Sequence, residues 1–458
     1  MNLEGEEGQK PDESGLPPGG KGEAPKPHGS GDAPTAGQGD GRSGTDRLME
    51  RVVERDNALA ALKRVRRNKG SPGVDGMSVD ELPKHLREHW KDLREQLLAG
   101  TYQPRPVRRH EIPKPDGGTR TLGIPTVLDR FIQQAILQVL QPLFDPGFSE
   151  HSYGFRPGRS AHDAVRVAQR HIQEGRRWVV DVDLEAFFDR VNHDVLMGRL
   201  AKRITDKRLL KLIRRYLEAG MMVKGVVMER EEGTPQGGPL SPLLANVLLD
   251  EVDKELEKRG HAFVRYADDC NVYVRSQRAG ERVMDGLRRL YTKLRLKVNE
   301  SKSAVARMQD RKFLGFRFWR GPKGEVKLRV APKATEAMKK RVRSITGRAR
   351  GGSMKAVVTE LGTYLRGWKG YFQLAQTPQK FRKLDSWIRR RLIAVQLAHW
   401  KHGTTAYGQL RARGVSKLRA SQAAAHVRQW WRTSTHGALN KAFPADHFVR
   451  AGVPHLAA

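Results

Sequence analysis

The chain has 458 residues, about three times the usual domain length of roughly 150, so we expect several modules. Lys and Arg total 85 against 51 Asp and Glu, and this formal charge of +34 favours a polyanionic partner such as nucleic acid over a merely soluble basic surface. The single cysteine excludes disulfides within the chain and cysteine-based zinc sites, and no apolar stretch is long enough to cross a bilayer, so we expect a cytoplasmic protein without membrane contact.

The predicted elements begin after a polar tail. Residues 1–47 are rich in Gly, Pro, Ser, Asp and Glu and contain almost no large apolar side chains, which predicts disorder. Apolar residues at helical spacing then predict a helix over 46–67, which ends at the turn-forming segment 68–73. A second helix is predicted over 79–98.

A basic β-hairpin is predicted next. Strand-like residues over 109–114 and 119–122 flank a Pro-Asp-Gly-Gly turn at 115–118. Lys114 and Arg120 lie beside this turn, where cations that reach over an active site can bind a triphosphate. On the residues alone, an exposed basic hairpin is the simpler interpretation.

The middle of the chain mixes helices and strands. Ser160 is expected to cap a helix that runs to about residue 173. Because strands and helices do not alternate strictly, the pattern favours an α+β fold over a doubly wound sheet. The other helices are predicted over 126–143, 192–219 and 239–258, and the strands over 178–183 and in both halves of 262–275.

Two acidic clusters lie in apolar, β-branched surroundings. In an extended strand over 180–183, Asp181 and Asp183 point to one side and the valines to the other, and one of these carboxylates is enough for a ligand. The segment Tyr266-Ala267-Asp268-Asp269 is predicted to be a hairpin tip that exposes both acids to a substrate groove. A polymerase that joins nucleotides through two Mg²⁺ ions needs such carboxylates side by side. Taken alone, the two adjacent acids could equally cap a β-turn.

The order of the motifs resembles the successive palm motifs of reverse transcriptases. These motifs are Asp183 to Phe188, Gly233 to Pro242, and Tyr266-Ala267-Asp268-Asp269. Other segments are similar to the group II intron reverse transcriptase/maturase family, in its bacterial type that lacks the endonuclease domain. They are Ile112-Pro113-Lys114, Leu122-Gly123-Ile124-Pro125-Thr126, Ser152 to Ser160 and Leu361 to Tyr371. The resemblance covers nearly all of residues 48–458.

The resemblance implies a role for each matching acid. Asp183 and Asp268 would be the ligands of two Mg²⁺ ions, and Asp269 would support them. Asp181 would be a neighbour of the site and no ligand.

The resemblance also implies residues that contact the nucleotide. Lys114 and Arg120 would bind the triphosphate, and Gln236 would approach the templating base pair because its small neighbours let the backbone come close. Phe188 would lie under the incoming sugar and exclude a 2′ hydroxyl, and a core aromatic is the alternative. For Lys302, the family pattern suggests a phosphate or proton-donor role, and an ordinary solvated lysine is the alternative.

The C-terminal part combines basic and aromatic side chains in a pattern that is almost wholly helical beyond residue 320, with apolar stripes over 361–368 and 384–392. Basic side chains neutralise phosphates, and aromatic side chains can stack on unpaired bases. The stripes place most of these aromatics in a core, so the cations are the better candidates. The predicted RNA-binding residues are Arg343, Arg348, Arg350, Arg366, Lys369, Arg389, Arg390 and Arg391.

The resemblance implies a right-hand polymerase. Its fingers would cover 48–176, an antiparallel palm 177–319, a helical thumb and maturase domain 320–400, and a helical RNA- and DNA-binding extension 401–458. The implied activity is RNA-directed DNA synthesis with maturase action on the parent intron. Expected partners are intron RNA, an RNA template, a DNA primer, dNTPs and target DNA. A domesticated polymerase in DNA repair or defence would have the same site, whereas a splicing cofactor that only binds RNA would need none of the acids.

Overall fold

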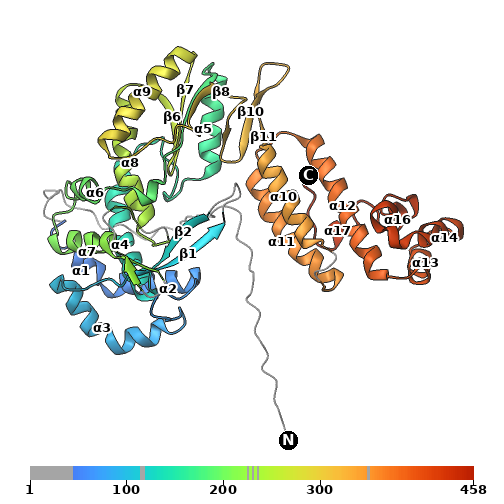
Figure 1. The fold of residues 1–458 in the computed structure, drawn as a ribbon, viewed down its shortest axis with the longest axis horizontal. Coiled ribbons are helices and arrows are strands. Elements are labelled where there is room, and N and C mark those ends of the chain that lie inside the picture. Colours follow the sequence, from blue (N-terminus) through green and yellow to red (C-terminus); the bar gives the residue numbers. More distant parts are fainter. Residues whose placement is uncertain are drawn as a thin grey trace, which may run out of the picture. The chain divides into compact units, whose positions relative to one another are not determined.

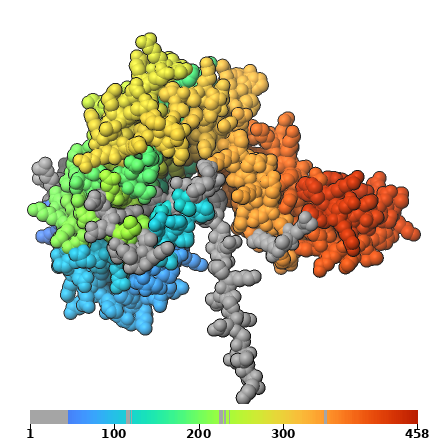
Figure 2. Space-filling model, in the orientation of Figure 1, coloured from blue at the N-terminus to red at the C-terminus, as the bar shows by residue number. Residues whose placement is uncertain are grey.

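The computed structural model describes residues 45–113, 119–223, 226–228, 232–234, 237–347 and 351–457. These residues fall into two compact units, of which the first ends at Arg311 and the second begins at Lys312. Figure 1 colours the first unit from blue to yellow and the second from orange to red, and Figure 2 shows their surfaces in the same colours. The tail predicted over 1–47 lies outside the described residues up to residue 44.

Three helices open the first unit: α1 (Leu48–Val52), α2 (Arg55–Asn68) and α3 (Leu82–Ala99). The single helix predicted over 46–67 is therefore wrong, because the backbone is extended at Glu54, with φ −60° and ψ 141°. The Asn57 side-chain amide donates to the Val52 carbonyl oxygen at 2.9 Å. This bond satisfies a carbonyl that the end of α1 leaves unpaired, a detail that apolar spacing does not reveal.

A four-stranded sheet in the order β2-β1-β4-β5 contains the predicted hairpin. Its strands are β1 (Val107–Pro113), β2 (Thr119–Ile124), β4 (Met221–Val223) and β5 (Val226–Met228). β1 and β2 are antiparallel, with Ile112 opposite Arg120, and the predicted turn at 115–118 lies outside the described residues. β1 also runs parallel to β4, so this sheet joins segments that are far apart in the sequence.

The sheet that carries both acidic clusters has four antiparallel strands in the order β6-β7-β3-β8. They are β3 (Trp178–Val182), β6 (Ala262–Tyr266), β7 (Asp269–Val274) and β8 (Ala304–Arg307). Val180 in the middle of β3 lies opposite Val272 of β7 and Val305 of β8. These apolar side chains alternate with polar ones, so one face of the sheet can be buried under helices.

Helices cover this sheet in Figure 1. The longer ones of the first unit are α4 (Val127–Phe144), α5 (Ala161–Gln173), α6 (His193–Leu200), α7 (Lys207–Glu218), α8 (Ser241–Lys258) and α9 (Gln277–Lys293). Ser160 caps α5 as predicted, in a reciprocal capping box with Asp163. The helix predicted over 192–219 is two helices, because the Asp206 side chain accepts hydrogen bonds from the backbone of Arg208 and Leu209 and so starts α7.

Two of these helices pack on the apolar face of the acidic sheet. α8 contacts β6, and α9 contacts β3, β7 and β8. The approach of α9 is close, since a Cβ atom added at Gly280 would lie 2.5 Å from the Val305 side chain and 3.4 Å from those of Val180 and Val274. The opposite face carries the buried side chains of Val179 and Tyr273 and, nearer the acids, Asp181 opposite Asn271. α5 contacts β6 and β7, and its His171 ring lies close to the Tyr273 ring. Helices therefore pack on both faces, and the polar residues of the second face lie toward the acidic end of the sheet.

The second unit begins with a three-stranded sheet in the order β11-β10-β9. Its strands are β9 (Lys312–Phe313), β10 (Phe316–Arg320) and β11 (Val326–Val330). The expectation of almost wholly helical structure beyond residue 320 is wrong over 326–330. Val326, Leu328 and Val330 are buried there and alternate with half-buried Lys327 and Arg329, which is the period of a strand.

The rest of the second unit is helical, and the predicted apolar stripes form its core. Leu361, Leu365 and Trp368 are buried on α11, and Leu384 and Ile388 are buried on α12. No helix among the described residues is both long and apolar enough to span a membrane. The helices are α10 (Pro332–Ile345), α11 (Met354–Phe372), α12 (Pro378–Trp400), α13 (Gly403–Ala412), α14 (Lys417–Ala425), α15 (Trp430–Thr433), α16 (Gly437–Ala442) and α17 (His447–Arg450).

Candidate active site

The strand register brings the two acidic clusters to one end of the sheet. Val182, the last residue of β3, lies opposite Cys270 of β7. Asp183 follows Val182 and Asp269 precedes Cys270, so the same register sets these two acids across from each other. Directly opposed residues of an antiparallel pair have Cα atoms roughly 4.5–5.5 Å apart. Acids that are far apart in the sequence thus become neighbours through backbone pairing alone.

Asp268 lies in a two-residue turn between β6 and β7. Tyr266 pairs with Asp269, which leaves Ala267 and Asp268 as the turn. The predicted tip thus contains only one of the two acids, while Asp269 is the first residue of β7 and is exposed. Ala267 has a φ of 57°, a left-handed conformation that costs a residue other than glycine about 1–2 kcal/mol. The turn holds this conformation only if its surroundings impose it.

A loop that follows α9 fixes the backbone of Asp183. The Asp183 N–H donates to Ser303 Oγ at 3.0 Å, and its carbonyl oxygen accepts from the Asn299 N–H at 2.8 Å. Lys302 belongs to the same loop, and its Nζ lies 3.8 Å from Asp183 Oδ1. The Lys302 side chain is 65% exposed and that of Asp183 37% exposed, so this ion pair is open to solvent. Sequence reasoning selected Lys302 but missed the two residues that hold the Asp183 backbone.

Asp181 has a cationic partner of its own. Arg311 Nη2 lies 2.6 Å from Asp181 Oδ2, and Arg311 Nε donates to the same oxygen at 2.8 Å. With its amide oriented to suit both neighbours, Asn271 also donates to Asp181 Oδ1 at 2.9 Å. The Asp181 side chain is 20% exposed. Its carboxylate is thus engaged within the sheet, beside Asp183.

The residues predicted to contact the nucleotide are only partly described. Lys114 and Gln236 lie outside the described residues, and so does the side chain of Arg120. Phe188 is half-buried and packs edge to face on Phe187, with ring centroids 5.1 Å apart. Part of the Phe188 side chain therefore packs on Phe187, and part of it is exposed to solvent.

The donor set of the site suits a hard divalent cation. Asp183, Asp268 and Asp269 offer carboxylate oxygens, which Mg²⁺ prefers. Among the described residues, no group of three or more His, Cys, Asp or Glu side chains could hold a metal ion by itself. Mg²⁺ usually keeps water or substrate phosphate in its shell and needs only one or two protein carboxylates. The residues present therefore fit a metal that arrives with its substrate.

The neighbouring cysteine takes no part in chemistry. Cys270 is fully buried on the apolar face of β7, opposite Arg265. Burial raises the pKa of the Cys270 thiol to about 12. The thiol is therefore protonated at neutral pH and is neither a nucleophile nor a metal ligand.

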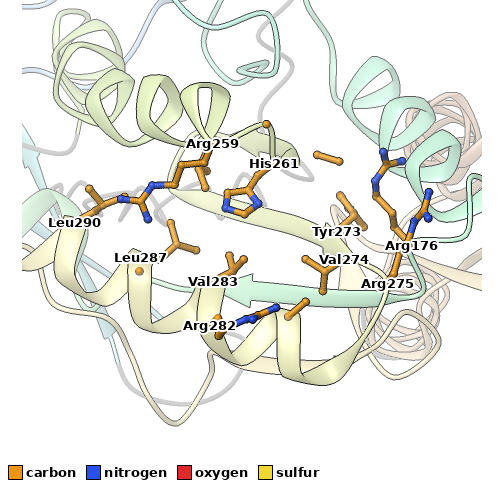
Figure 3. Close-up of a pocket in the computed structure, with 15 residues that line it drawn as sticks. Arg176, Arg259, His261, Tyr273, Val274, Arg275, Arg282, Val283, Leu287 and Leu290 are labelled. Carbon is orange, nitrogen blue, oxygen red and sulfur yellow. The ribbon is translucent and has the colours of Figure 1, made fainter.

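A cavity of about 560 Å³ lies at the other end of the same sheet. Ala262, which begins β6, and Val274, which ends β7, both line it. It is thus about five residues, or roughly 15 Å, from the turn that carries Asp268. Figure 3 shows Arg259, Arg275 and Arg282 among the side chains around it. This cavity is separate from the acids and forms no part of the candidate active site.

Several arginines predicted to bind RNA also join segments of the second unit. Arg389 donates to the Phe443 carbonyl oxygen at 2.7 Å, and Arg390 donates to that of Trp431 at 3.1 Å. Each of these bonds fastens the C-terminal segment to α12.

Two more of these arginines make similar bonds. Arg391 donates to the Thr346 carbonyl oxygen at 3.1 Å, and Arg366 donates to that of Gly452 at 2.8 Å. Partial burial lowers the pKa of Arg389 and Arg391, because desolvation disfavours the charged guanidinium.

Arg343 and Lys369 are the other members of this set that the structure describes. Arg343 is exposed and its guanidinium lies 5.7 Å from the centre of the Trp387 ring. Lys369 is half-buried on α11. Arg348 and Arg350 lie outside the described residues.

Two family models match the chain. "Reverse transcriptase (RNA-dependent DNA polymerase)" matches residues 112–318, and "Group II intron, maturase-specific domain" matches residues 335–414. The first match includes all three acids of the candidate site. The predicted α+β fold of a right-hand polymerase is confirmed by this match.

Curated relatives agree with these matches. Protein YkfC of Escherichia coli is 39% identical over 219 residues, which are 46% of this chain and 58% of that protein. The group II intron-encoded protein LtrA of Lactococcus lactis subsp. cremoris is 38% identical over 209 residues, which are 45% of this chain and 35% of that protein. The chain thus spans less than two thirds of each of these relatives.

The close packing of Gly154 on the turn that carries Asp268 can be tested by measuring stability. A Cβ atom added at Gly154 would lie 2.2 Å from the Ala267 backbone nitrogen and 2.9 Å from the Tyr266 carbonyl carbon. Gly154→Ala should therefore displace the turn and lower the free energy of unfolding by about 1–3 kcal/mol, measured by urea denaturation.

Gly198→Ala is the matched control. Gly198 is an exposed residue within α6 and has no atom within 4 Å of its added Cβ. Alanine there should raise the free energy of unfolding by roughly 0.5–1 kcal/mol. Equal effects of the two substitutions would contradict the close packing of Gly154 on the turn.

Proposed function

Because the chain belongs to the family of group II intron reverse transcriptases and maturases, we propose that it synthesises DNA on an RNA template and binds intron RNA as a maturase. The observation that carries the polymerase function is the strand register. It sets Asp183 across from Asp269, next to the turn that holds Asp268. Carboxylates from two neighbouring strands at one end of a sheet are what nucleotidyl transfer with two metal ions requires.

In this proposal Asp183 and Asp268 hold two Mg²⁺ ions and Asp269 supports them. When bound, the ions would activate the primer 3′ hydroxyl and stabilise the leaving pyrophosphate. The loop that fixes the Asp183 backbone keeps that carboxylate at this end of the sheet while substrates exchange. Lys302 lies beside Asp183 and places a positive charge where phosphate oxygens would gather.

The side chains around the acids would select the substrate. Phe188 has its inner side on Phe187, so a rigid aromatic surface is available to exclude a 2′ hydroxyl. Lys114 and Arg120 would contact the dNTP triphosphate, and Gln236 would lie near the templating base pair. These three roles rest on the motif resemblance.

Nucleic acid is the proposed partner of both units. The net charge of +34 favours phosphate binding with a strong dependence on salt. The match to the maturase-specific domain supports intron RNA as the ligand of residues 335–414. Arg343, Lys369, Arg348 and Arg350 remain candidates for phosphate contacts, together with the four arginines that also bond within the second unit. Target DNA would be bound by the same positive charge.

Asp268→Asn tests the polymerase site. Loss of the carboxylate should weaken metal binding and lower the rate of primer extension on an RNA template by on the order of 1,000-fold, since metal ions contribute several kcal/mol to transition-state stabilisation. The Kd for template RNA should stay within about two-fold, because RNA affinity comes mainly from phosphate contacts with cations.

Asp285→Asn is the control for this substitution. Asp285 lies on α9 in the same unit, is 59% exposed and pairs with Arg288. Its loss should leave both measurements unchanged, because exposed ion pairs contribute little. Primer extension by Asp268→Asn at the rate of the wild-type chain would refute the site assignment.

Phe188→Ala tests the proposed sugar selection. Removing the ring should lower the ratio of kcat/KM for dNTP over rNTP by roughly 10- to 100-fold, a change typical of one lost steric contact. Phe144→Leu, a substitution of a buried phenylalanine at the end of α4, is the control and should lower stability but keep the ratio. If Phe188→Ala kept the wild-type ratio in single-nucleotide incorporation, the sugar would be checked by another residue.

A further inference from the structure

Arg265 is a fully buried arginine, and each nitrogen of its guanidinium has a hydrogen-bond partner. Its side chain and that of Asp253 on α8 are both 0% exposed and pair at 2.6 Å between Nη2 and Oδ2. Arg265 Nε also donates to Asp253, at 2.8 Å to Oδ1. Burial opposes the charge of Arg265, but Asp253 outweighs this effect and raises the pKa of the guanidinium. Arg265 is therefore charged in the folded protein.

The remaining nitrogen of this guanidinium reaches the turn that carries Asp268. Arg265 Nη1 donates to the Ala267 carbonyl oxygen at 2.8 Å and to Asn246 Oδ1 at 2.8 Å. The Ala267 carbonyl belongs to the peptide that joins Ala267 to Asp268. A bond to this oxygen fixes the orientation of the peptide plane, and hence the direction in which the Asp268 Cα–Cβ bond leaves the backbone.

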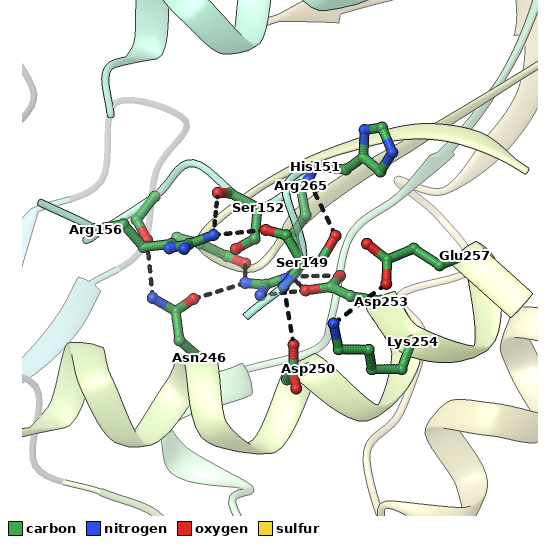
Figure 4. A network of polar contacts seen from close by, with 12 residues as sticks. Ser149, His151, Ser152, Arg156, Asn246, Asp250, Asp253, Lys254, Glu257 and Arg265 are labelled. Carbon is green, nitrogen blue, oxygen red and sulfur yellow. Dashed lines mark hydrogen bonds and ion pairs between the residues drawn. The ribbon is translucent and has the colours of Figure 1, made fainter. Parts of the chain in front are cut away.

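The same network holds the loop that packs on the turn. The Asn246 amide donates to the Gly154 carbonyl oxygen at 2.9 Å, and a Cβ at Gly154 would meet the Ala267 nitrogen. In addition, the Tyr153 N–H donates to the Arg265 carbonyl oxygen at 2.9 Å. Figure 4 shows Asn246 and Asp253 of α8 beside the Arg265 guanidinium. The turn thus contacts both the Arg265 guanidinium and the loop.

Stability alone does not explain a buried ion pair at this position. Replacing such a pair by apolar side chains of similar volume is often neutral or stabilising, because the charges no longer have to be removed from water. An apolar side chain, however, cannot donate to the Ala267 carbonyl oxygen. Ala267 has a left-handed φ of 57°, which its own side chain disfavours. A hydrogen-bond donor fixed in the core, here the Arg265 guanidinium, keeps this turn in one conformation.

We infer that Arg265 is a positioning residue of the active site, which holds the Ala267–Asp268 peptide so that the Asp268 carboxylate points to the metal site. This inference rests on the proposed polymerase function. The chain of contacts runs from Asp253 on α8 through the Arg265 guanidinium to the Ala267 carbonyl oxygen. Asp253 orients the guanidinium, and Asn246 completes its geometry. None of these three side chains contacts substrate.

Arg265→Lys in the full chain tests the inference. Lysine retains a positive charge for Asp253, but its single nitrogen cannot serve Asp253, Asn246 and the Ala267 carbonyl in the planar fork of arginine. With Mg²⁺, RNA template and DNA primer, kcat should fall on the order of 100-fold, as misplacement of a catalytic group by about 1 Å can cause. The KM for dNTP and the Kd for template RNA should stay within about two-fold.

A second readout needs no metal and no turnover. Hydrogen exchange over residues 266–269 of the metal-free protein should be faster in Arg265→Lys than in the wild-type chain, because the turn has lost its fixed donor. Arg208→Lys is the control. Arg208 lies on α7 and, like Arg265, pairs with a buried aspartate, since the side chain of Asp206 is 1% exposed. It should change neither exchange over 266–269 nor kcat.

The outcomes separate this inference from the proposed function. If exchange over 266–269 and kcat of Arg265→Lys both stay within two-fold of wild type, Arg265 does not position the turn. A loss of kcat that only follows the unfolded fraction, with unchanged exchange and Mg²⁺ dependence, would likewise overturn the inference. Failure of the proposed function would show separately, as activity of Asp268→Asn.

A double substitution covers the case in which Arg265→Lys does not fold. Arg265→Met with Asp253→Leu removes both buried charges and should keep the melting temperature near that of the wild-type chain. It should still show the loss of kcat and the faster exchange over 266–269. If this variant also fails to fold, or folds with wild-type kcat, the inference is wrong, because the network would then serve the fold and not the turn.

Discussion

The antiparallel pairing of β3 with β7 is the constraint on which the active site depends. It sets Val182 opposite Cys270 and so fixes Asp183 beside the turn that joins β6 to β7. A slip by one residue would turn every side chain of β3 to the other face of the sheet. Asp183 would then point toward α8 and α9, and Val180 would leave the core. The packing of α9 on Val180 and Val305 therefore protects the register and, with it, the position of the acids.

The two faces of this sheet have different tasks. The apolar face is covered by α8 and α9 and contains the Arg265–Asp253 pair, which reaches through the core to the backbone of the turn. The opposite face carries Asp181, which pairs with Arg311 next to Asp183. Because side chains alternate along a strand, one residue can support the site from the face under α8 and α9 while the next residue faces the substrate.

The sequence predicted those parts of the structure that depend on local patterns. The Ser160 cap, the hairpin of β1 and β2, and the strands around both acidic clusters follow from neighbouring residues. The parallel pairing of β1 with β4 and the contact of Arg265 with Asp253 join distant segments, and no local pattern shows them. The extended backbone at Glu54 was not predicted, because apolar residues continue at helical spacing on both sides of it.

The arginines of α12 show the same limit for function. A run of three arginines on a basic chain resembles a phosphate-binding surface, yet Arg389, Arg390 and Arg391 all donate to carbonyl oxygens within the second unit. Charge and spacing predict that such residues are cationic. They do not predict which carbonyl oxygens the fold brings within reach, because those come from segments more than forty residues away.

The most direct measurement of the central claim is the position of the metal ions. Crystals of the full chain with an RNA template, a DNA primer, a non-hydrolysable dNTP and Mn²⁺ in place of Mg²⁺ would give anomalous peaks at the metal sites. We predict two peaks roughly 4 Å apart, each about 2 Å from a carboxylate oxygen of Asp183 or Asp268. Metal bound elsewhere, with neither of these two residues as a ligand, would contradict the account.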